Sequence, residues 1–323
     1  SEVIADGYMY TSRYIRKPTR NDNLWKQSLV QQCENKYCGK LTVSVFTGEE
    51  PKGKTLCHAC GLPLVSSKVM IIPENGFIIE PEVEKVTTKK PKKTPRTEFY
   101  YLGLLKQDSI NTAKSYTLNL TKVSVISSPD DKLLVMNKSD FLVCQTCGYS
   151  KKSMGKPFAS TAHKTPRGTD CPSKSLIKRH LGHVFKTDVA LLTLNRQLES
   201  NEAITILYSL LEGLSKYFDI DRDDIDGCIS YQSYASEGAE LGTTFVLFDS
   251  VPGGAGNVRR IFDADKNDFF GFLRCSLDRV RKCNCGTDGD MVCYSCLCNF
   301  KNQHYQEKMQ RRYAISFLEA LLE

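Results

Sequence analysis

The feature that most constrains this chain is its supply of cysteines, fourteen in 323 residues, most of them in closely spaced pairs. Five fall between residues 283 and 298, and four of these read C-x-C-x7-C-x2-C: Cys283, Cys285, Cys293 and Cys296. Two tight cysteine pairs joined by a loop supply the tetrahedron of thiolates that Zn²⁺ prefers, and the energy of metal binding also stabilises the fold. The spacing predicts a zinc centre, followed by a long polar helix.

A second quartet lies near the start of the chain and reads C-x4-C-x18-C-x2-C: Cys33, Cys38, Cys57 and Cys60. Between its two pairs, LTVSVF alternates as a β-strand does. A glycine follows each pair, as a knuckle that turns backbone N–H groups toward thiolates requires. The pattern predicts a Cys₄ zinc ribbon, with His58 as a bystander inside the second knuckle.

A third knuckle, CQTCG, is not followed by another cysteine pair. A histidine and a single cysteine lie downstream, on a loop rich in Gly, Pro, Ser and Thr that needs an anchor. Together these residues predict a Cys₃His zinc site. Its ligands would be Cys144, Cys147, His163 and Cys171. His180 or His183 could replace His163, and the sequence leaves that choice open.

The composition is that of an ordinary globular protein, with 41% hydrophobic and 25% charged residues. Paired cysteines in a lysine-rich chain favour metal binding in a reducing cytosol over a disulfide framework. No signal peptide opens the chain, and no apolar run approaches the roughly 20 residues that cross a bilayer. We expect a soluble, cytoplasmic protein with no membrane partner. Because the chain opens at Ser1, it could be the tail of a longer polypeptide or a trimmed subunit.

Periodicity predicts the elements between the sites. VMIIPENGFII (69–79) has the pattern of two strands about an Asn-Gly turn, and residues 98–143 are rich in strands. RHLGHVFKTDVALLTL (179–194) is expected to pass from a polar turn into an apolar strand. SNEAITILYSLLEGLSKYFDI (200–220) predicts an amphipathic helix, capped by Ser200 or Asn201.

Further along, TTFVLFDS is apolar almost throughout, which is typical of a central strand buried on both faces. KNDFFGFLRCSLDRVRKC predicts a helix that leads to Cys283, and the chain ends in another helix. Residues 1–32 interleave aromatic and basic residues, which could stack on bases; an irregular lead-in whose aromatics pack on the next module is the simpler interpretation.

These modules predict an α+β protein in several zinc-bearing parts. The expected parts are a lead-in with the Cys₄ zinc ribbon (1–84), a basic linker (85–97), a β-rich module with the Cys₃His site (98–187), and a mixed α/β domain closed by the last cysteine cluster (188–323).

A formal net charge of +7 favours an anionic partner such as nucleic acid, although many soluble proteins carry a similar charge. The linker supplies candidate phosphate contacts in Lys89, Lys90, Lys92 and Lys93, unless it is only a solvated loop. A second candidate is VPGGAGNVRRIF (251–262), where a strand, a glycine-rich turn and a helix could present N–H groups and the cations Arg259 and Arg260 to a phosphate. The alternative is a tight turn that needs glycine for its backbone.

An enzymatic hypothesis uses His163, His180, His183 and Asp188 around a catalytic metal, as a nuclease would. The alternative for His180, His183 and Asp188 is a hydrogen-bonded polar corner at the start of a strand. The sequence contains neither a Walker A motif nor a D-E-x-[HD] box.

Several motifs in order carry a family resemblance: LGHVFKTDV, EAITILYSLLEGL, DIDG, VLFDSVPGGAG and a cysteine cluster ending CYSCLCNFKNQHYQ. From about residue 140 to the end, the chain resembles the zinc-binding C-terminal region of MrfA-type superfamily-two helicases. It is similarly close to DrmB, the subunit that accompanies the DrmA helicase in the DISARM anti-phage system. The upstream ribbon fits this family more loosely.

The resemblance implies a zinc-stabilised accessory region that acts with a DNA-translocating motor, in phage defence or DNA repair. It places the family's last cysteine quartet on Cys283, Cys285, Cys293 and Cys296. The gap before Cys293 is longer than the family pattern implies, so Cys298 could replace Cys283 or Cys285. A superfamily-two helicase and DNA are the expected partners, and a nuclease or a pure protein-assembly module are the alternatives.

Overall fold

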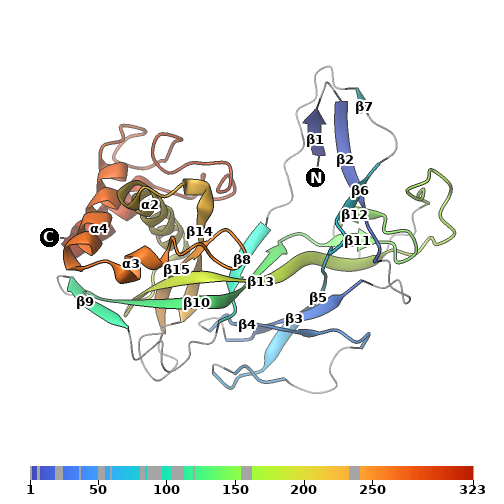
Figure 1. Cartoon of the computed structure of the whole chain (residues 1–323), viewed down its shortest axis with the longest axis horizontal. Helices are drawn as coiled ribbons and strands as arrows, with labels where there is room; N and C mark the ends of the chain where they lie inside the picture. Colours follow the sequence, from blue (N-terminus) through green and yellow to red (C-terminus); the bar gives the residue numbers. More distant parts are fainter. Residues whose placement is uncertain are drawn as a thin grey trace.

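One strand, β13 (Ile177–Leu194), links almost every part of the protein (Figure 1). The computed structural model describes residues 2–5, 8–18, 25–35, 38–49, 55–58, 60–80, 84–85, 97–103, 113–118, 121–153, 162–232 and 241–322. Within them, β13 pairs with β10 (Thr121–Asn137), β11 (Phe141–Val143), β5 (Leu64–Ile71) and β15 (Leu241–Asp249). The expected α+β class is confirmed, with a mixed sheet of eleven described strands at its centre.

The polar half of β13 is strand rather than the expected turn. RHLGHVFKTD continues as β-structure because β10 runs antiparallel beside it, from Gly182 opposite Met136 to Leu194 opposite Val123. β10 is the longest described strand of the region 98–143, which is expected to be rich in strands, and it bulges between Ser128 and Asp131. A partner strand of this length supplies hydrogen bonds that local polarity cannot predict.

The zinc ribbon joins this sheet through β5. The strands β3 (Gln27–Cys33), β4 (Leu41–Val45) and β5 are antiparallel, and β5 lies parallel to β13 at His180 and Leu181. β5 and β6 (Phe77–Ile79) confirm the two strands predicted about the Asn-Gly turn, but they do not form a hairpin in the described part of the chain. β6 pairs instead with β2 (Tyr8–Ile15).

The N-terminal residues are not an irregular lead-in. β1 (Glu2–Ala5), β2, β6 and β7 (Glu84–Lys85) form a second small sheet. The expected packing of the aromatics is confirmed at Tyr14 and Trp25, which are buried. Trp25 packs with Ile71, Val143 and Leu181, so residues on both sides of the linker share one core cluster.

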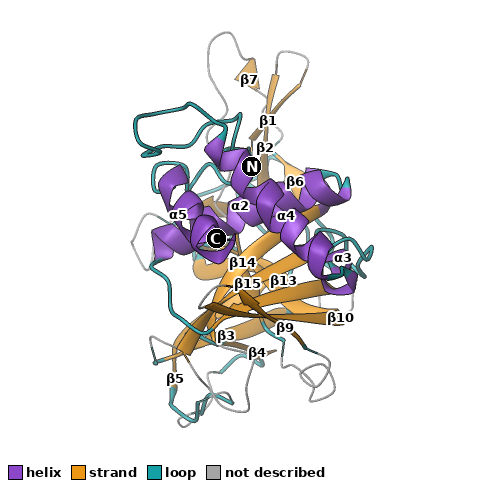
Figure 2. Ribbon diagram, turned by 90° about the vertical axis from the view of Figure 1, so that its left-hand side faces the viewer, coloured by secondary structure: helices purple, strands orange, loops and turns teal. Residues whose placement is uncertain are grey.

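The C-terminal half layers helices on the sheet (Figure 2). The sheet portion consists of β8 (Thr97–Tyr101), β9 (Lys114–Leu118), β10, β13, β15 and β14 (Ile225–Gln232). The helices α2 (Ser200–Phe218), α4 (Lys266–Arg281) and α5 (Arg311–Leu322) pack together, with the short α3 (Arg259–Asp263) and the 3₁₀ turn η1 (Arg222–Asp224) beside them. The four residues from Phe245 to Phe248 of β15 are fully buried, as expected for a central strand.

Two helix boundaries differ from expectation. The N-cap of α2 is Glu199, and no side chain caps it. After the last cysteines the chain forms turns until α5 begins at Arg311, so the long polar helix is absent there. Asn299 and Asn302 explain the turns, because each side chain accepts a hydrogen bond from the other's backbone N–H, at 2.9 and 3.0 Å. No described helix is both long and apolar enough to cross a membrane.

Candidate metal centres

The first quartet assembles at one end of the zinc ribbon. Cys33 ends β3, Cys38 lies on the turn to β4, and the second knuckle precedes β5. The Sγ atoms of Cys33 and Cys60 are 3.4 Å apart, and those of Cys38 and Cys57 are 3.7 Å apart. Gly39 and Gly61 have positive φ angles, as predicted for the knuckles. His58 is exposed and outside the group.

The second group joins β11, β12 (Ser150–Lys152) and the loop beyond. Cys144 and Cys147 lie in the hairpin between these strands, and Cys171 donates its backbone N–H to the carbonyl of His163 at 3.0 Å. The Sγ atoms of Cys144 and Cys171 are 3.8 Å apart. His163 is buried and stacks on Tyr149, with ring centroids 4.7 Å apart.

His163, rather than His180 or His183, meets the cysteines of the second group. The ring of His180 instead lies 3.3 Å from the carbonyl oxygen of Asn137, and that of His183 lies against Phe185. Burial raises the pKa of the Cys144 thiol, but hydrogen bonds from backbone N–H groups and from His163 outweigh it and bring the pKa to about 6. A thiol so perturbed is readily held as thiolate, which is the form that binds metal.

Gly148, which follows the Cys144 and Cys147 knuckle, also contacts β2 of the N-terminal sheet. Gly148 has a φ of 80°, and its carbonyl accepts a hydrogen bond from the N–H of Ile15 at 2.8 Å. A Cβ atom at Gly148 would lie 2.2 Å from the Ile15 carbonyl oxygen. Gly168 has the same φ of 80° but no heavy atom within 4 Å of such a Cβ. An alanine at Gly168 would therefore meet only backbone strain, whereas an alanine at Gly148 would meet both backbone strain and a steric clash with Ile15.

We expect Gly148→Ala to lower the free energy of unfolding by at least about 3 kcal/mol, because left-handed strain and overpacking act together. Gly168→Ala, which carries the strain alone, should cost about 1–2 kcal/mol. Urea unfolding of the zinc-loaded variants measures both. Equal destabilisation would show that the contact with Ile15 contributes nothing.

The third group closes the C-terminal domain. α4 leads into Cys283, and the loop that follows returns Cys293 and Cys296 to it. The Sγ atoms of Cys283 and Cys293 are 3.5 Å apart, and those of Cys285 and Cys296 are 3.9 Å apart. Cys298 donates its backbone N–H to the Cys293 carbonyl, but its thiol lies outside the group.

A buried arginine supports the third group. Arg311, the first residue of α5, donates to the carbonyl oxygens of Val280 at 2.9 Å and Cys285 at 2.5 Å. Four thiolates around Zn²⁺ leave two negative charges, and a buried guanidinium nearby offsets part of them. Arg311 therefore ties the ends of α4 and α5 to the metal loop.

All three groups fit zinc. In each, the four ligand atoms lie within 4.8 Å of one another. A tetrahedron of sulfur atoms 2.3 Å from zinc has edges of about 3.8 Å, close to the sulfur separations in this protein. Four soft or borderline donors with no open position are typical of a structural zinc site rather than a catalytic one.

The residues of the nuclease hypothesis are not brought together. His180, His183 and Asp188 all lie on β13, where the last two are roughly 16 Å apart along an extended strand. Among the described residues, they belong to none of the groups able to hold a metal. The Asp188 carboxylate accepts a hydrogen bond from the N–H of Gly256 at 3.1 Å, so it is a structural partner of the glycine-rich turn.

The backbone N–H groups of the glycine-rich turn between β15 and α3 donate hydrogen bonds to aspartate side chains of the same chain. Asp249 is fully buried at the end of β15, and its two oxygens accept from the N–H groups of Ala255, Asn257 and Val258 at 2.6, 3.1 and 3.0 Å. These are the N–H groups that a phosphate would need. A tight internal turn therefore explains the glycines.

The predicted cationic contacts stay predictions. Arg259 pairs with Asp263, and the Arg260 guanidinium lies over the Phe218 ring, 5.0 Å from its centroid. Lys89, Lys90, Lys92 and Lys93 of the linker lie outside the described residues. The predicted parts 1–84, 85–97, 98–187 and 188–323 also remain a prediction.

The amino-acid sequence is similar to one protein-family model and to one curated protein. Residues 206–297 match the family model of the MrfA Zn-binding domain, which ends one residue after Cys296. The chain is 25% identical over 317 residues to Druantia protein DruE of Escherichia coli (strain UMEA 4076-1). That alignment covers 87% of this chain but only 16% of DruE.

Among solved structures, DUF1998 helicase MrfA bound to DNA is similar, with 16% identity, a TM-score of 0.38, and coverage of 74% of this chain and 26% of that one. The same helicase bound to DNA and AMPPNP gives 14% identity, a TM-score of 0.30, and coverage of 73% and 23%. The chain thus spans about a quarter or less of the length of DruE and of these two MrfA chains.

Proposed function

We propose that this chain, whose residues 206–297 form a MrfA-type zinc-binding domain, is an accessory region that grips DNA beside the motor of a superfamily-two helicase. The observation that carries the proposal is that the family match falls on the third zinc group and on α4, the helix that leads into it. The ATPase belongs to another domain or subunit. Zinc holds the loops that would touch DNA or the motor.

The setting of this activity is either phage defence or DNA repair. The resemblance to DrmB favours a DISARM-like defence role, and the resemblance to MrfA-type helicases favours repair. Copurification of the tagged chain with a helicase, followed by phage challenge and DNA-damage assays of cells lacking the gene, distinguishes these roles. Resistance to phage lost without any sensitivity to DNA damage would support defence.

A basic groove supports the DNA-binding part of the proposal. A hollow of about 270 Å³ lies between the zinc ribbon and β10, and its lining contains three basic residues, Lys40, His58 and Lys132, and no acidic one. Burial lowers the pKa of Lys40, an effect opposed by the nearby Cys38, Cys57 and Asp131. Cations gathered on a low-dielectric wall attract phosphate. The sequence gives no sign of this groove, because its lining residues come from five separate segments.

We expect duplex or single-stranded DNA to bind the zinc-loaded chain with an affinity that falls steeply with salt. Four phosphate contacts would weaken binding about 100-fold between 50 and 200 mM salt. Fluorescence anisotropy with a labelled oligonucleotide measures this. Affinity that does not change over that range would contradict a grip on phosphates.

Lys132→Gln tests the groove directly, since Lys132 is exposed and lines it. The substitution should weaken DNA binding and reduce the slope of log affinity against log salt concentration by about one. Lys266→Gln is the matched control, because Lys266 is also exposed but lies on α4, outside the groove. Equal loss in the two variants would mean that only net charge matters.

A pure protein-assembly module is the second candidate. Large apolar side chains are exposed on and just after the third zinc loop, at Met291, Tyr294 and Phe300. Exposed apolar residues that form one continuous patch are typical of contact with a partner protein. Copurification with a helicase, without retention on DNA at low salt, would favour this module over the DNA grip.

A further inference from the structure

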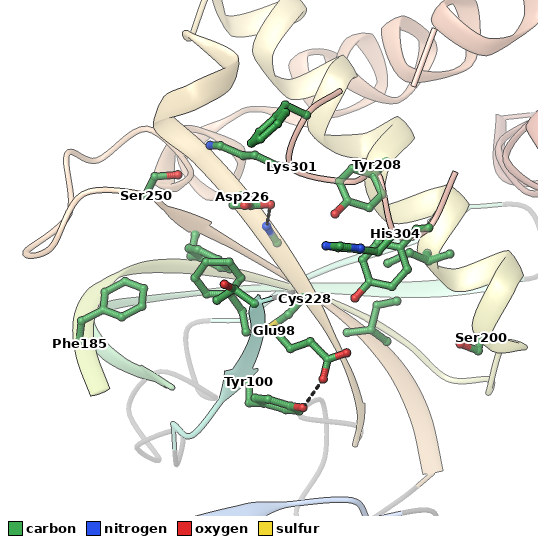
Figure 3. Close-up of a pocket in the computed structure, with 18 of the residues that line it drawn as sticks. Glu98, Tyr100, Phe185, Ser200, Tyr208, Asp226, Cys228, Ser250, Lys301 and His304 are labelled. Atoms are coloured by element: carbon green, nitrogen blue, oxygen red, sulfur yellow. Dashed lines mark hydrogen bonds between the residues drawn. The ribbon is translucent and has the colours of Figure 1, made fainter. Parts of the chain in front are cut away.

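A cavity of about 620 Å³ opens in the C-terminal half, where β8 and β14 face each other (Figure 3). β8 is paired with β10 and β14 with β15, so the two strands border a seam in the sheet. The first turns of α2 form one wall, and the loop after the third zinc group forms another. A cavity of this size accommodates a small organic ligand rather than an ion.

Aromatic rings from separate elements surround the cavity. Tyr100 lies on β8, Phe185 on β13 and Tyr208 on α2, and Figure 3 places them on different sides of the space. Tyr305 lies beside Tyr208, with ring centroids 6.2 Å apart. Phe300, at the mouth, is 72% exposed. Such faces favour a flat ring that can stack between them.

Two carboxyl groups lie among the rings. Glu98 has a side chain only 17% exposed, and its carboxylate accepts from the Tyr100 hydroxyl at 2.6 Å and pairs with Lys138 at 3.3 Å. Asp226 is buried and accepts from the N–H of Gly227 at 2.9 Å. Carboxylate oxygens in fixed positions accept hydrogen bonds from the amino group of a base such as cytosine.

Basic side chains lie on the loop that forms the wall. Lys301 and His304 both line the cavity, and Lys301 reaches the carboxylate and the backbone carbonyl of Asp223 at 3.4 and 3.1 Å. The Asp223 side chain is 87% exposed. An ion pair in water is weak, so a phosphate could replace Asp223 as the partner of Lys301.

We propose that this cavity takes one unstacked base of a single-stranded nucleic acid, stacked on its aromatic walls, with a base amino group donating to Glu98 and the flanking phosphate near Lys301. This inference rests on the proposed DNA-binding function and names the part of the ligand that enters the protein. Stacking tolerates any base, and Glu98 adds a preference for bases with an amino group.

Zinc and the cavity are linked through the wall loop. Asn302 is buried and donates to the carbonyl of Leu297 at 2.7 Å, one residue after Cys296. The reciprocal hydrogen bonds of Asn299 and Asn302 then set the path of the chain toward Phe300 and His304. A filled third zinc site therefore holds the wall that the base would touch.

The test compares strands of equal charge. Zinc-loaded chain is titrated with labelled 12-mers of oligo-dC, oligo-dT and an abasic 12-mer with the same phosphates. We expect the abasic strand to bind about tenfold more weakly than oligo-dT, the loss typical of one stacked base. Phe300→Ala should remove most of that difference, whereas Phe77→Ala, another exposed phenylalanine on β6, should leave it unchanged.

Glu98→Gln provides an independent readout, because it should reduce the preference for oligo-dC over oligo-dT while leaving stacking intact. Melting curves and zinc content establish that each variant is folded. Equal affinity for abasic and base-bearing strands, with a normal salt dependence, would overturn the cavity inference alone and leave the space to a polypeptide partner. No binding to any strand at low salt would contradict the proposed function as well.

Discussion

Cys296→Ser should reduce bound zinc from about three ions per chain to two and lower the melting temperature by more than about 10 °C. Cys296 is buried, its thiol belongs to the third group, and Val292 and Leu297 of the same loop are buried in the main core cluster beside it. A structural zinc contributes its binding energy to folding, so losing one ligand releases the loop and frees the ends of α4 and α5. Elemental analysis and differential scanning fluorimetry measure the two effects.

Cys298→Ser is the matched control for this experiment. It removes the fifth cysteine of the same loop, whose thiol lies outside the group, so it should keep three zinc ions and nearly the original melting temperature. If instead Cys298→Ser lost a zinc ion and Cys296→Ser kept it, the ligand set assigned to the third centre would be wrong.

Asp249→Ala should lower the free energy of unfolding by about 3–5 kcal/mol, without touching any zinc ligand. The substitution leaves three backbone N–H groups of the glycine-rich turn without their carboxylate acceptor, and each buried donor left unsatisfied costs about 1–3 kcal/mol. Partial entry of water into the turn keeps the total below the sum. Urea unfolding measures the change.

Asp263→Ala controls for the loss of a carboxylate in the same region. Asp263 lies on α3, is 60% exposed and pairs only weakly with Arg259, so its removal should cost less than about 1 kcal/mol. Asp249→Asn should fall between the two, because one amide oxygen can still accept. If Asp249→Ala were no more harmful than Asp263→Ala, the turn would not depend on its internal carboxylate.

The metal groups could be predicted from the sequence because each knuckle is local. A cysteine pair separated by one to four residues and followed by a glycine fixes two ligands and the turn between them, as at Cys144, Cys147 and Gly148. The loop's need for an anchor predicted a histidine ligand, but the sequence left His163, His180 and His183 as alternatives, and the fold brings His163 to the cysteines. The cysteine spacing alone could not show whether Cys298 replaces Cys283 or Cys285 as a zinc ligand. The path of the loop leaves the Cys298 thiol outside the group.

The features that the sequence did not predict depend on contacts between segments that are distant in sequence. Nothing in RHLGHVFKTD shows that β10 lies beside it, so its polarity suggested a turn. Asp249 immediately precedes the glycine-rich turn, and this adjacency was a signal that the turn carries its own anion. The cavity at the seam of β8 and β14 draws on several elements separated in sequence, and no local pattern predicts it.

The length of β13 has a mechanical consequence. Its eighteen residues extend about 60 Å, and the same strand is hydrogen-bonded to the zinc ribbon at one end and to the helix-covered sheet at the other. Pulling along such a ladder loads many hydrogen bonds in shear at once. A motor domain that displaced the helix-covered end of β13 would therefore also displace the zinc ribbon, because the strand would transmit the movement along its length.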